Sequence, residues 1–128
     1  MNTVLVIDDD PDIAELVRLN LKSEGYAVEH ASNGEEGLEL ARSIQPGLII
    51  LDVLMPRKDG LSTFEDILAD EVLRSIPVIM LTSVNAKLGF NLTVGDLETQ
   101  YGKAPEAFVE KPISRSELLY SVHRYLPQ

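Results

Sequence analysis

The sequence predicts an α/β fold in which a doubly wound sheet of five parallel strands is covered by helices on both faces. Three observations lead to this prediction. Short apolar runs rich in β-branched residues alternate with segments whose apolar residues recur at helical spacing. Helix-capping signals mark several of the boundaries between the two kinds of segment. Alternating strands and helices form βαβ units with right-handed crossovers, which place the strands parallel in one sheet.

The first strand–helix pair occupies residues 3 to 25. The run Thr3–Ile7 is almost entirely apolar and rich in β-branched residues, which is typical of a strand buried on both faces. Asp10 is a good N-cap residue and Pro11 suits the first helical position, so a helix is predicted to begin here and to end at Gly25. The apolar residues at helical spacing are Ile13, Leu16, Val17 and Leu21.

The second strand–helix pair occupies residues 26 to 46. Tyr26–Ala31 alternates between apolar and polar residues well enough to form an outer strand. Asn33 and Glu36 make a capping box at the start of the next helix, which ends before Pro46. One face of this helix carries Gly37, Leu38, Ala41 and Ile44.

The centre of the chain reads LIILDVLMPRKDG from residue 48 to residue 60. Gly47–Leu51 is the predicted third strand, and it ends on Asp52, after which proline and glycine turn the chain into a loop. A helix is predicted within Leu61–Ile76, followed by a fourth buried strand at Pro77–Leu81. The apolar residues of that helix at helical spacing are Phe64, Ile67, Leu68 and Val72.

The last part of the chain contains one segment without a clear pattern. Ser83–Glu106 holds three glycines and a proline, and we expect a helix somewhere in Ala86–Leu97. Ala107–Glu110 is the predicted fifth strand, and Ser114 with Glu117 forms a capping box for the final helix. The residues predicted to face inward from that helix are Leu118, Leu119, Val122, Tyr125 and Leu126.

Size and composition indicate one soluble domain covering residues 1–128. No segment approaches 18 consecutive apolar residues, so neither a membrane span nor a secretory signal is predicted, and we expect a cytoplasmic protein. The absence of cysteine excludes disulfides, thiolate catalysis and cysteine-ligated zinc. The net charge of −10 argues against direct nucleic-acid binding and favours cations and basic partner surfaces.

Polar side chains follow four of the predicted strands at their carboxyl ends. In a parallel sheet these ends share one edge, which is where ligands bind in open α/β sheets. In the flavodoxin-like strand order 2-1-3-4-5 the first and third strands are neighbours, so their acidic residues are expected to converge. The residues concerned are Asp8, Asp9 and Asp10 after the first strand, Asp52 after the third, Thr82 and Ser83 after the fourth, and Lys111 after the fifth.

This set of side chains fits phosphoryl chemistry. Clustered carboxylates repel one another unless a cation lies among them, and an all-oxygen ligand set selects Mg²⁺ or Mn²⁺. Lys111 and Thr82 would add an ammonium group and a hydroxyl donor, so the edge is suited to a tetrahedral dianion. Asp52 is then the candidate nucleophile that forms an aspartyl phosphate.

Taken singly, each of these residues has an ordinary structural explanation. Asp10 is a helix N-cap, a lone Asp52 would end a strand in a turn, and a lone Lys111 would be a solvated surface charge. His30 and His123 show no partner pattern and are expected at the surface. The functional interpretation depends on four separate strand ends all carrying groups that one chemistry requires.

At this point the sequence resembles the receiver domain of two-component response regulators. The resemblance extends over essentially the whole chain and is carried by VLVIDDDP, LIILDVLMPRKDG, PVIMLTS and FVEKP in that order. It implies that Asp52 accepts a phosphoryl group from a phosphohistidine on a sensor histidine kinase or a phosphotransfer protein. It also implies that Asp9, Asp52 and the main-chain carbonyl of Leu54 ligate Mg²⁺ directly, with Asp8 acting through water.

The resemblance further assigns a conformational switch. Thr82 and Lys111 would contact the phosphoryl oxygens, and Phe108 occupies the aromatic switch position. The Lys111–Pro112 bond is expected to be cis. Thr82 and Phe108 are 26 positions apart, which is several more than receivers usually have, so an enlarged or irregular fourth-helix region is expected.

Other interpretations remain open at this stage. The leading one is a stand-alone phosphoacceptor that is not an enzyme and signals to a protein target, with no direct contact to nucleic acid or membrane. The chain could also be the receiver part of a larger response regulator. A phosphatase with an aspartyl-phosphate intermediate is less favoured, because such enzymes usually carry a second aspartate two residues after the nucleophile, where this chain has Leu54. A receiver that binds partners without phosphorylation is disfavoured by the complete set of acidic, hydroxyl and lysine residues.

Overall fold

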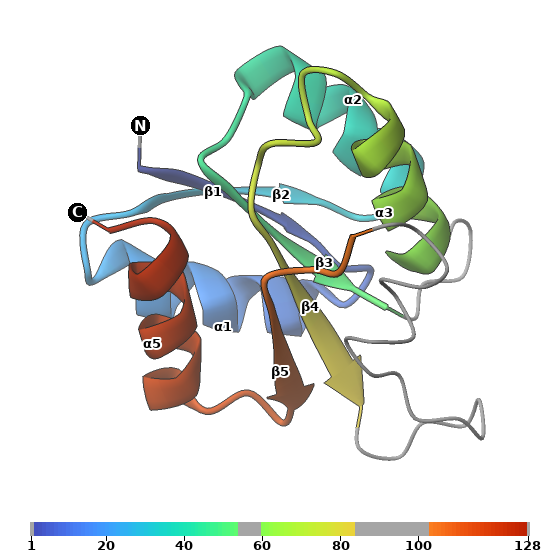
Figure 1. Ribbon diagram of the computed structural model, residues 1–128. Coiled ribbons are helices and arrows are strands. Elements are labelled where there is room, and N and C mark those ends of the chain that lie inside the picture. Colours follow the sequence, from blue (N-terminus) through green and yellow to red (C-terminus); the bar gives the residue numbers. More distant parts are fainter. Residues whose placement is uncertain (1, 54–59, 84–102, 128) are drawn as a thin grey trace.

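The structure is a computed structural model that describes residues 2–53, 60–83 and 103–127 (Figure 1). These residues form one parallel sheet with helices on both faces. The strands are β1 (Thr3–Ile7), β2 (Ala27–Ala31), β3 (Leu48–Asp52), β4 (Val78–Ser83) and β5 (Ala107–Lys111). The helices are α1 (Pro11–Lys22), α2 (Gly34–Ile44), α3 (Gly60–Ala69) and α5 (Arg115–Tyr125).

The strand order is β2-β1-β3-β4-β5 with all neighbours parallel, which confirms the predicted flavodoxin-like topology. The register aligns the carboxyl ends of the central strands at one edge. Asp52 pairs with Leu81 on β4, and Ser83 at the end of β4 pairs with Lys111 at the end of β5. The arrowheads of β3, β4 and β5 accordingly point the same way in Figure 1.

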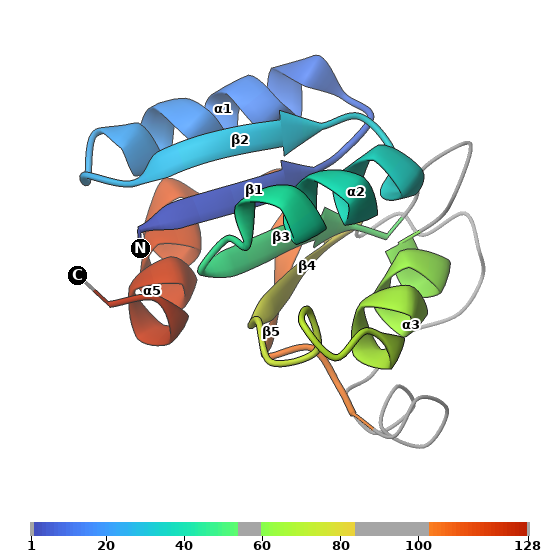
Figure 2. The same cartoon turned by 90° about the horizontal axis from the view of Figure 1, so that it is seen from above.

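Two hydrophobic clusters lie on opposite faces of the sheet. One is formed with α1 and α5, and it buries Val17, Leu21, Leu118 and Val122 against alternate residues of the strands. The other is formed with α2 and α3, and Phe64 and Ile67 are its buried α3 members. Figure 2 shows the twisted sheet between these helix pairs. Because both faces are covered, β1 and β3 are completely buried from Val4 to Ile7 and from Leu48 to Leu51, as their apolar runs predict.

The predicted helix caps are confirmed with one shift. The Asp10 side chain accepts a hydrogen bond from the backbone N–H of Asp12, and Ser114 accepts one from Glu117. Asn33 accepts from the Glu36 N–H at 2.9 Å, but the Glu36 carboxylate accepts from the N–H of Ser32 at 3.3 Å instead of from Asn33. The start of α2 therefore has both hydrogen bonds of a capping box, but the Glu36 carboxylate binds the N–H one residue before the N-cap residue.

The predicted helix Leu61–Ile76 was too long. Helix α3 ends at Ala69, and the next residues form turns. The side chain of Asp70 accepts hydrogen bonds from the N–H groups of Val72 and Leu73, so it starts a new local turn in place of the next helical one. Leu73 is consequently buried, whereas Val72, the last apolar residue of the predicted helical spacing, is 49% exposed.

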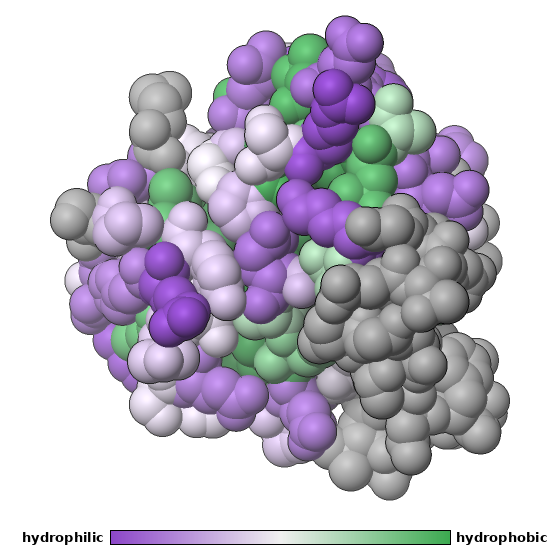
Figure 3. All heavy atoms as spheres, in the orientation of Figure 1, coloured by the Kyte–Doolittle hydropathy of each residue, from purple (hydrophilic) through white to green (hydrophobic). Residues whose placement is uncertain are grey.

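The helix expected between Ala86 and Leu97, and with it the enlarged fourth-helix region, lies outside the described residues. No helix among residues 2–53, 60–83 and 103–127 is long and apolar enough to cross a membrane. Polar residues dominate the face seen in Figure 3, although apolar atoms are visible in the area of β5. β5 carries two partly buried apolar residues, Ala107 and Phe108.

Candidate functional site

The carboxyl end of β1 places two aspartates with opposite exposure. Asp8 is completely buried, whereas Asp9 is exposed. The Asp8 carboxylate accepts a hydrogen bond from the backbone N–H of Asp10 at 2.9 Å through Oδ1, which makes a tight turn into α1. The turn directs the chain away from the sheet while the Asp8 carboxylate stays at the strand end.

Asp52 ends β3 and is 4% exposed. The next residue, Val53, still donates its N–H to Leu81 on β4, so the strand keeps its place in the sheet beyond the aspartate. Helix α3 begins close by, because the N–H of Gly60 donates to the Val53 carbonyl at 2.8 Å. A side chain at position 60 would collide with the backbone of Asp52 and Val53, so a glycine is required here.

Lys111, at the end of β5, bridges the two buried aspartates. Its Nζ lies 3.1 Å from Oδ1 of Asp52 and 3.2 Å from Oδ2 of Asp8. Burial by itself lowers the pKa of Lys111, but the neighbouring Asp52 and Asp8 carboxylates more than offset this, so its pKa lies above the usual value. The side chain is therefore an ammonium group that partly neutralises the acidic cluster. The Lys111–Pro112 peptide bond is cis, as expected.

Asp8, Asp9 and Asp52 form a cluster that can hold a hard cation. One carboxylate oxygen from each residue lies within 4.8 Å of the others. Among the described residues, Oδ2 of Asp8 is a buried side-chain oxygen that receives no hydrogen bond, and Lys111 reaches it as an ion pair. Three carboxylates and one lysine leave negative charge in excess, so the donor set fits a divalent cation such as Mg²⁺.

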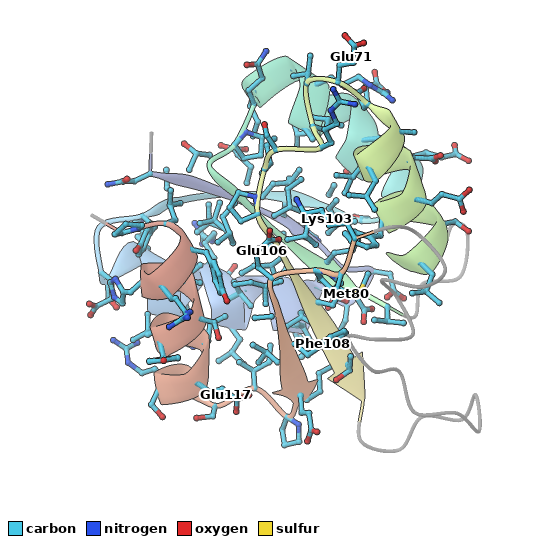
Figure 4. The ribbon with its side chains drawn as sticks, in the orientation of Figure 1. Glu71, Met80, Lys103, Glu106, Phe108 and Glu117 are labelled. Carbon is cyan, nitrogen blue, oxygen red and sulfur yellow. The ribbon has the colours of Figure 1, made fainter. Side chains whose placement is uncertain are left out.

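The other expected site residues have different outcomes. Thr82 lies on β4 one residue beyond Leu81, the partner of Asp52, and therefore at the same edge of the sheet. Phe108 lies on β5 opposite Met80 and is partly buried against the α2–α3 cluster (Figure 4). The carbonyl of Leu54 lies outside the described residues. The structure thus brings Asp8, Asp9, Asp52 and Lys111 into one cluster and places Thr82 beside it.

His30 and His123 were expected at the surface and showed no partner pattern in the sequence, but each has a hydrogen-bond partner in the structure. The side chain of His30 is exposed, but its Nε2 lies 2.8 Å from the main-chain carbonyl oxygen of Asp8. His123 Nδ1 lies 3.0 Å from the hydroxyl of Tyr26, far from the site. A signal for His30 exists in the sequence, because it is the penultimate residue of the second strand and thus belongs to the same carboxyl edge as Asp8. The predicted site included residues at the ends of the other four strands but none from this one.

Comparison with known proteins places this geometry in a family. The sequence matches the profile of the response regulator receiver domain over residues 4–123. This chain belongs to the response regulator receiver domain family. Such receivers are the phosphoacceptor switches of two-component signalling, and they interact with histidine kinases or phosphotransfer proteins.

Two curated relatives of this receiver differ in length. The polar-differentiation response regulator DivK of Brucella anthropi is 32% identical, and the match covers 97% of this chain and 95% of DivK. The DNA-binding dual master transcriptional regulator RpaA of Synechocystis is 35% identical, and the match covers 98% of this chain but 49% of RpaA. The receiver therefore spans about half the length of some relatives and nearly all of another.

Solved structures confirm the fold of the receiver. A response regulator from Chloroflexus aurantiacus superposes with a TM-score of 0.84 at 29% identity, with 99% of this chain and 98% of that chain covered. The chemotaxis protein CheY4 of Vibrio cholerae gives a TM-score of 0.82 at 28% identity, with 98% and 99% covered.

Proposed function

We propose that Asp52 is the phosphoacceptor of this receiver and takes its phosphoryl group from a phosphohistidine of a histidine kinase or phosphotransfer protein. The observation that carries the proposal is the Lys111 ammonium, held 3.1 Å from Asp52 and 3.2 Å from Asp8. A buried carboxylate beside a fixed cation and two further acids is the arrangement that phosphoryl transfer to a carboxylate needs.

The proposed transfer is a single displacement at phosphorus. A carboxylate oxygen of Asp52 attacks, the P–N bond of the phosphohistidine breaks, and the imidazole leaves with the electron pair and takes up a proton. Asp52 gains a mixed anhydride and the negative charge of the phosphoryl oxygens. Lys111 can then exchange its contact with the carboxylate for one with a phosphoryl oxygen, because its flexible ammonium group already lies at the reacting carboxylate.

We propose that Asp8, Asp9 and Asp52 hold Mg²⁺, or Mn²⁺, with the Leu54 carbonyl contributing as the family resemblance implies. When bound, the cation supplies positive charge for the phosphoryl oxygens. The buried Oδ2 of Asp8, which receives no hydrogen bond and is held by the ion pair with Lys111, and the oxygen-only donor set support this assignment. The acids themselves keep the cluster negative enough to attract the cation in the presence of Lys111.

We propose that Thr82 and Phe108 convert phosphorylation into a change of surface. Thr82 would move its hydroxyl towards the new phosphoryl oxygens, and Phe108 would turn inward into the space that this movement leaves. Phe108 is partly buried beside Met80, so an inward rotation requires only a limited repacking. The proposed output is a contact with a protein in the cytoplasm. Direct binding to nucleic acid or to a membrane is not proposed, because the net charge of −10 disfavours anionic surfaces. Residues 1–128 would act as one receiver domain, not as a turnover enzyme.

The test compares the wild type with Asp52→Asn. Each protein is incubated with Mg²⁺ and phosphoramidate, whose P–N bond imitates phosphohistidine, and the intact mass is measured. We expect one phosphoryl group on the wild type, removable by hydroxylamine as an acyl phosphate, and none on Asp52→Asn. Asp12→Asn, which changes an exposed aspartate in the first turn of α1, is the matched control and should behave as the wild type. Equal phosphorylation of Asp52→Asn would refute the assignment.

A further inference from the structure

His30 joins β2 to the backbone of the acidic cluster. It is the penultimate residue of β2 and pairs with Val6 on β1, so its ring lies near the end of the neighbouring strand. Its Nε2 lies 2.8 Å from the carbonyl oxygen of Asp8. A carbonyl oxygen has no proton to give, so Nε2 carries the hydrogen and donates it.

The carbonyl that His30 contacts belongs to the peptide unit between Asp8 and Asp9. Because a peptide unit is planar, a bond that holds its carbonyl also holds the N–H and Cα of the next residue. The orientation of this one unit therefore affects both acids. It determines where the exposed Asp9 leaves the strand relative to the buried Asp8.

Two other hydrogen bonds restrain Asp8, but neither acts on that peptide unit. The N–H of Asp8 donates to the carbonyl of Ala31 at 3.1 Å, which continues the pairing of β1 with β2. The side chain of Asp8 accepts from the N–H of Asp10 at 2.9 Å. Within residues 2–53, 60–83 and 103–127, the hydrogen bond that holds the Asp8 carbonyl comes from His30.

We propose that His30 is a positioning residue for the metal site: its Nε2–H holds the Asp8–Asp9 peptide so that both carboxylates are directed at a bound divalent cation. The inference rests on the proposed function, because it concerns the same metal. His30 itself does not touch the cation. Its effect is to fix the ligand geometry before binding, so that the exposed Asp9 loses less conformational freedom when the cation binds.

The experiment measures Mg²⁺ affinity by titration calorimetry in the full chain. His30→Ala should bind Mg²⁺ about tenfold more weakly, at the lower end of what loss of such a supporting bond costs metal sites. His30→Gln should recover most of the affinity, because its side-chain amide can donate to the same carbonyl. His123→Ala removes the other histidine, whose partner is Tyr26, and should bind as the wild type.

A second readout does not require the metal. In the metal-free protein, the amides of Asp9 and Asp10 should exchange with solvent faster in His30→Ala and return to wild-type rates in His30→Gln. Wild-type affinity and exchange in His30→Ala would overturn the inference, as would a His30→Gln variant that fails as His30→Ala does. A wild type that binds no Mg²⁺ would instead overturn the proposed metal site, and this inference with it.

Discussion

Asp52 and Gly60 are in backbone contact, so the residue at position 60 affects the backbone that holds Asp52, the proposed phosphoacceptor. A Cβ atom added at Gly60 would collide with the carbonyl oxygen of Asp52 and would lie 2.7 Å from Cα of Val53. Backbone atoms cannot rotate away as a side chain can. Position 60 therefore tolerates only the smallest residue if Asp52 is to keep its place.

Gly60→Ala is predicted to destabilise the protein although the residue lies in a helix. An alanine in a helix is normally stabilising relative to glycine by about 0.5–1 kcal/mol. The collision with the Asp52 backbone should reverse the sign and lower the free energy of unfolding by about 1–3 kcal/mol, as for other overpacked sites. Urea unfolding followed by circular dichroism measures the change in the free energy of unfolding. Binding of the phosphate analogue beryllofluoride in the presence of Mg²⁺ should weaken as well.

Gly37→Ala is the comparison variant. Its added Cβ would also be close to a neighbour, 2.5 Å from Cδ1 and 2.7 Å from Cγ1 of Ile7, but these are side-chain atoms, which a change of rotamer can move. We expect a smaller loss of stability and unchanged beryllofluoride binding. Equal behaviour of the two variants would contradict the importance of the Asp52 backbone contact.

At the level of whole elements, Asp70 links two helices and ends one of them. It follows α3, and its carboxylate accepts a hydrogen bond of 2.9 Å from the guanidinium Nε–H of Arg42 on α2. This hydrogen bond, with backbone N–H groups of Val72 and Leu73 in addition, holds the pKa of Asp70 below its usual value. One side chain thus stabilises the turn after α3 and the contact between α2 and α3.

The stability that Asp70 contributes should depend on pH in one direction. A carboxyl group whose pKa is lower in the folded state than in the unfolded state stabilises the protein at pH values above its unfolded-state pKa. This stability is lost as the pH falls through the folded-state pKa. Arg42→Gln should therefore be less stable than the wild type at pH 6, and the difference should shrink once the pH falls below about 3.8. Urea unfolding at a series of pH values measures it.

Arg124→Gln serves as the control for this pH series. The guanidinium of Arg124 contacts the hydroxyl of Tyr125, so its loss should give a difference from the wild type that acid does not change. A difference for Arg42→Gln that stays constant down to pH 3 would show that the carboxylate of Asp70 is not the partner that matters.

The sequence predicts where the elements begin better than where they end. Asp10, Asn33 and Ser114 are recognisable caps because the side chain and its backbone partner are close in sequence. The end of α3 was missed because the apolar spacing continues through Val72, and because the Arg42–Asp70 contact that supports the turn joins residues 28 positions apart. Local patterns do not contain such long-range contacts.

The candidate site was predictable to the extent that topology alone determines it. Once the strand order places β1 beside β3, Asp8 and Asp52 must be neighbours, and the same edge receives Lys111. The ion pairs of Lys111 with both acids, and the bond from His30 to the Asp8 carbonyl, depend on side-chain rotamers. Strand order does not specify these, so they became visible only in the structure.

At the scale of the molecule, the C-terminal helix is attached to the corner between α1 and β2. The hydroxyl of Tyr26 donates to the carbonyl of Leu126 at 2.6 Å, and because it has one proton it accepts its second bond from Nδ1–H of His123. Arg115, at the other end of α5, contacts Asn20 at 2.8 Å. Both ends of α5 are thereby tied to the last turn of α1 and the residues that follow it.

Tyr26→Phe is predicted to loosen this attachment without disturbing the core. Tyr26 is 2% exposed, and burial raises the pKa of its hydroxyl, which therefore keeps the proton that it donates. Loss of the hydroxyl should lower the free energy of unfolding by about 1–2 kcal/mol and speed amide exchange at the end of α5. Tyr120→Phe, at a tyrosine that is 67% exposed on the same helix, should change neither quantity.

β5 is bonded to a single neighbouring strand, β4, in the described sheet, and each of its ends has a distinct task. One end carries Lys111 at the acidic cluster. Just before the other end lies Glu106, which is labelled in Figure 4. Its carbonyl accepts a hydrogen bond of 3.0 Å from the hydroxyl of Tyr125 on α5. An edge strand can slide or tilt without breaking a second ladder of hydrogen bonds. β5 therefore connects Lys111 at the acidic cluster with Phe108, the second residue of the strand, and with the contact to α5 just before its first residue, so a shift of Lys111 along β5 would be expected to displace both.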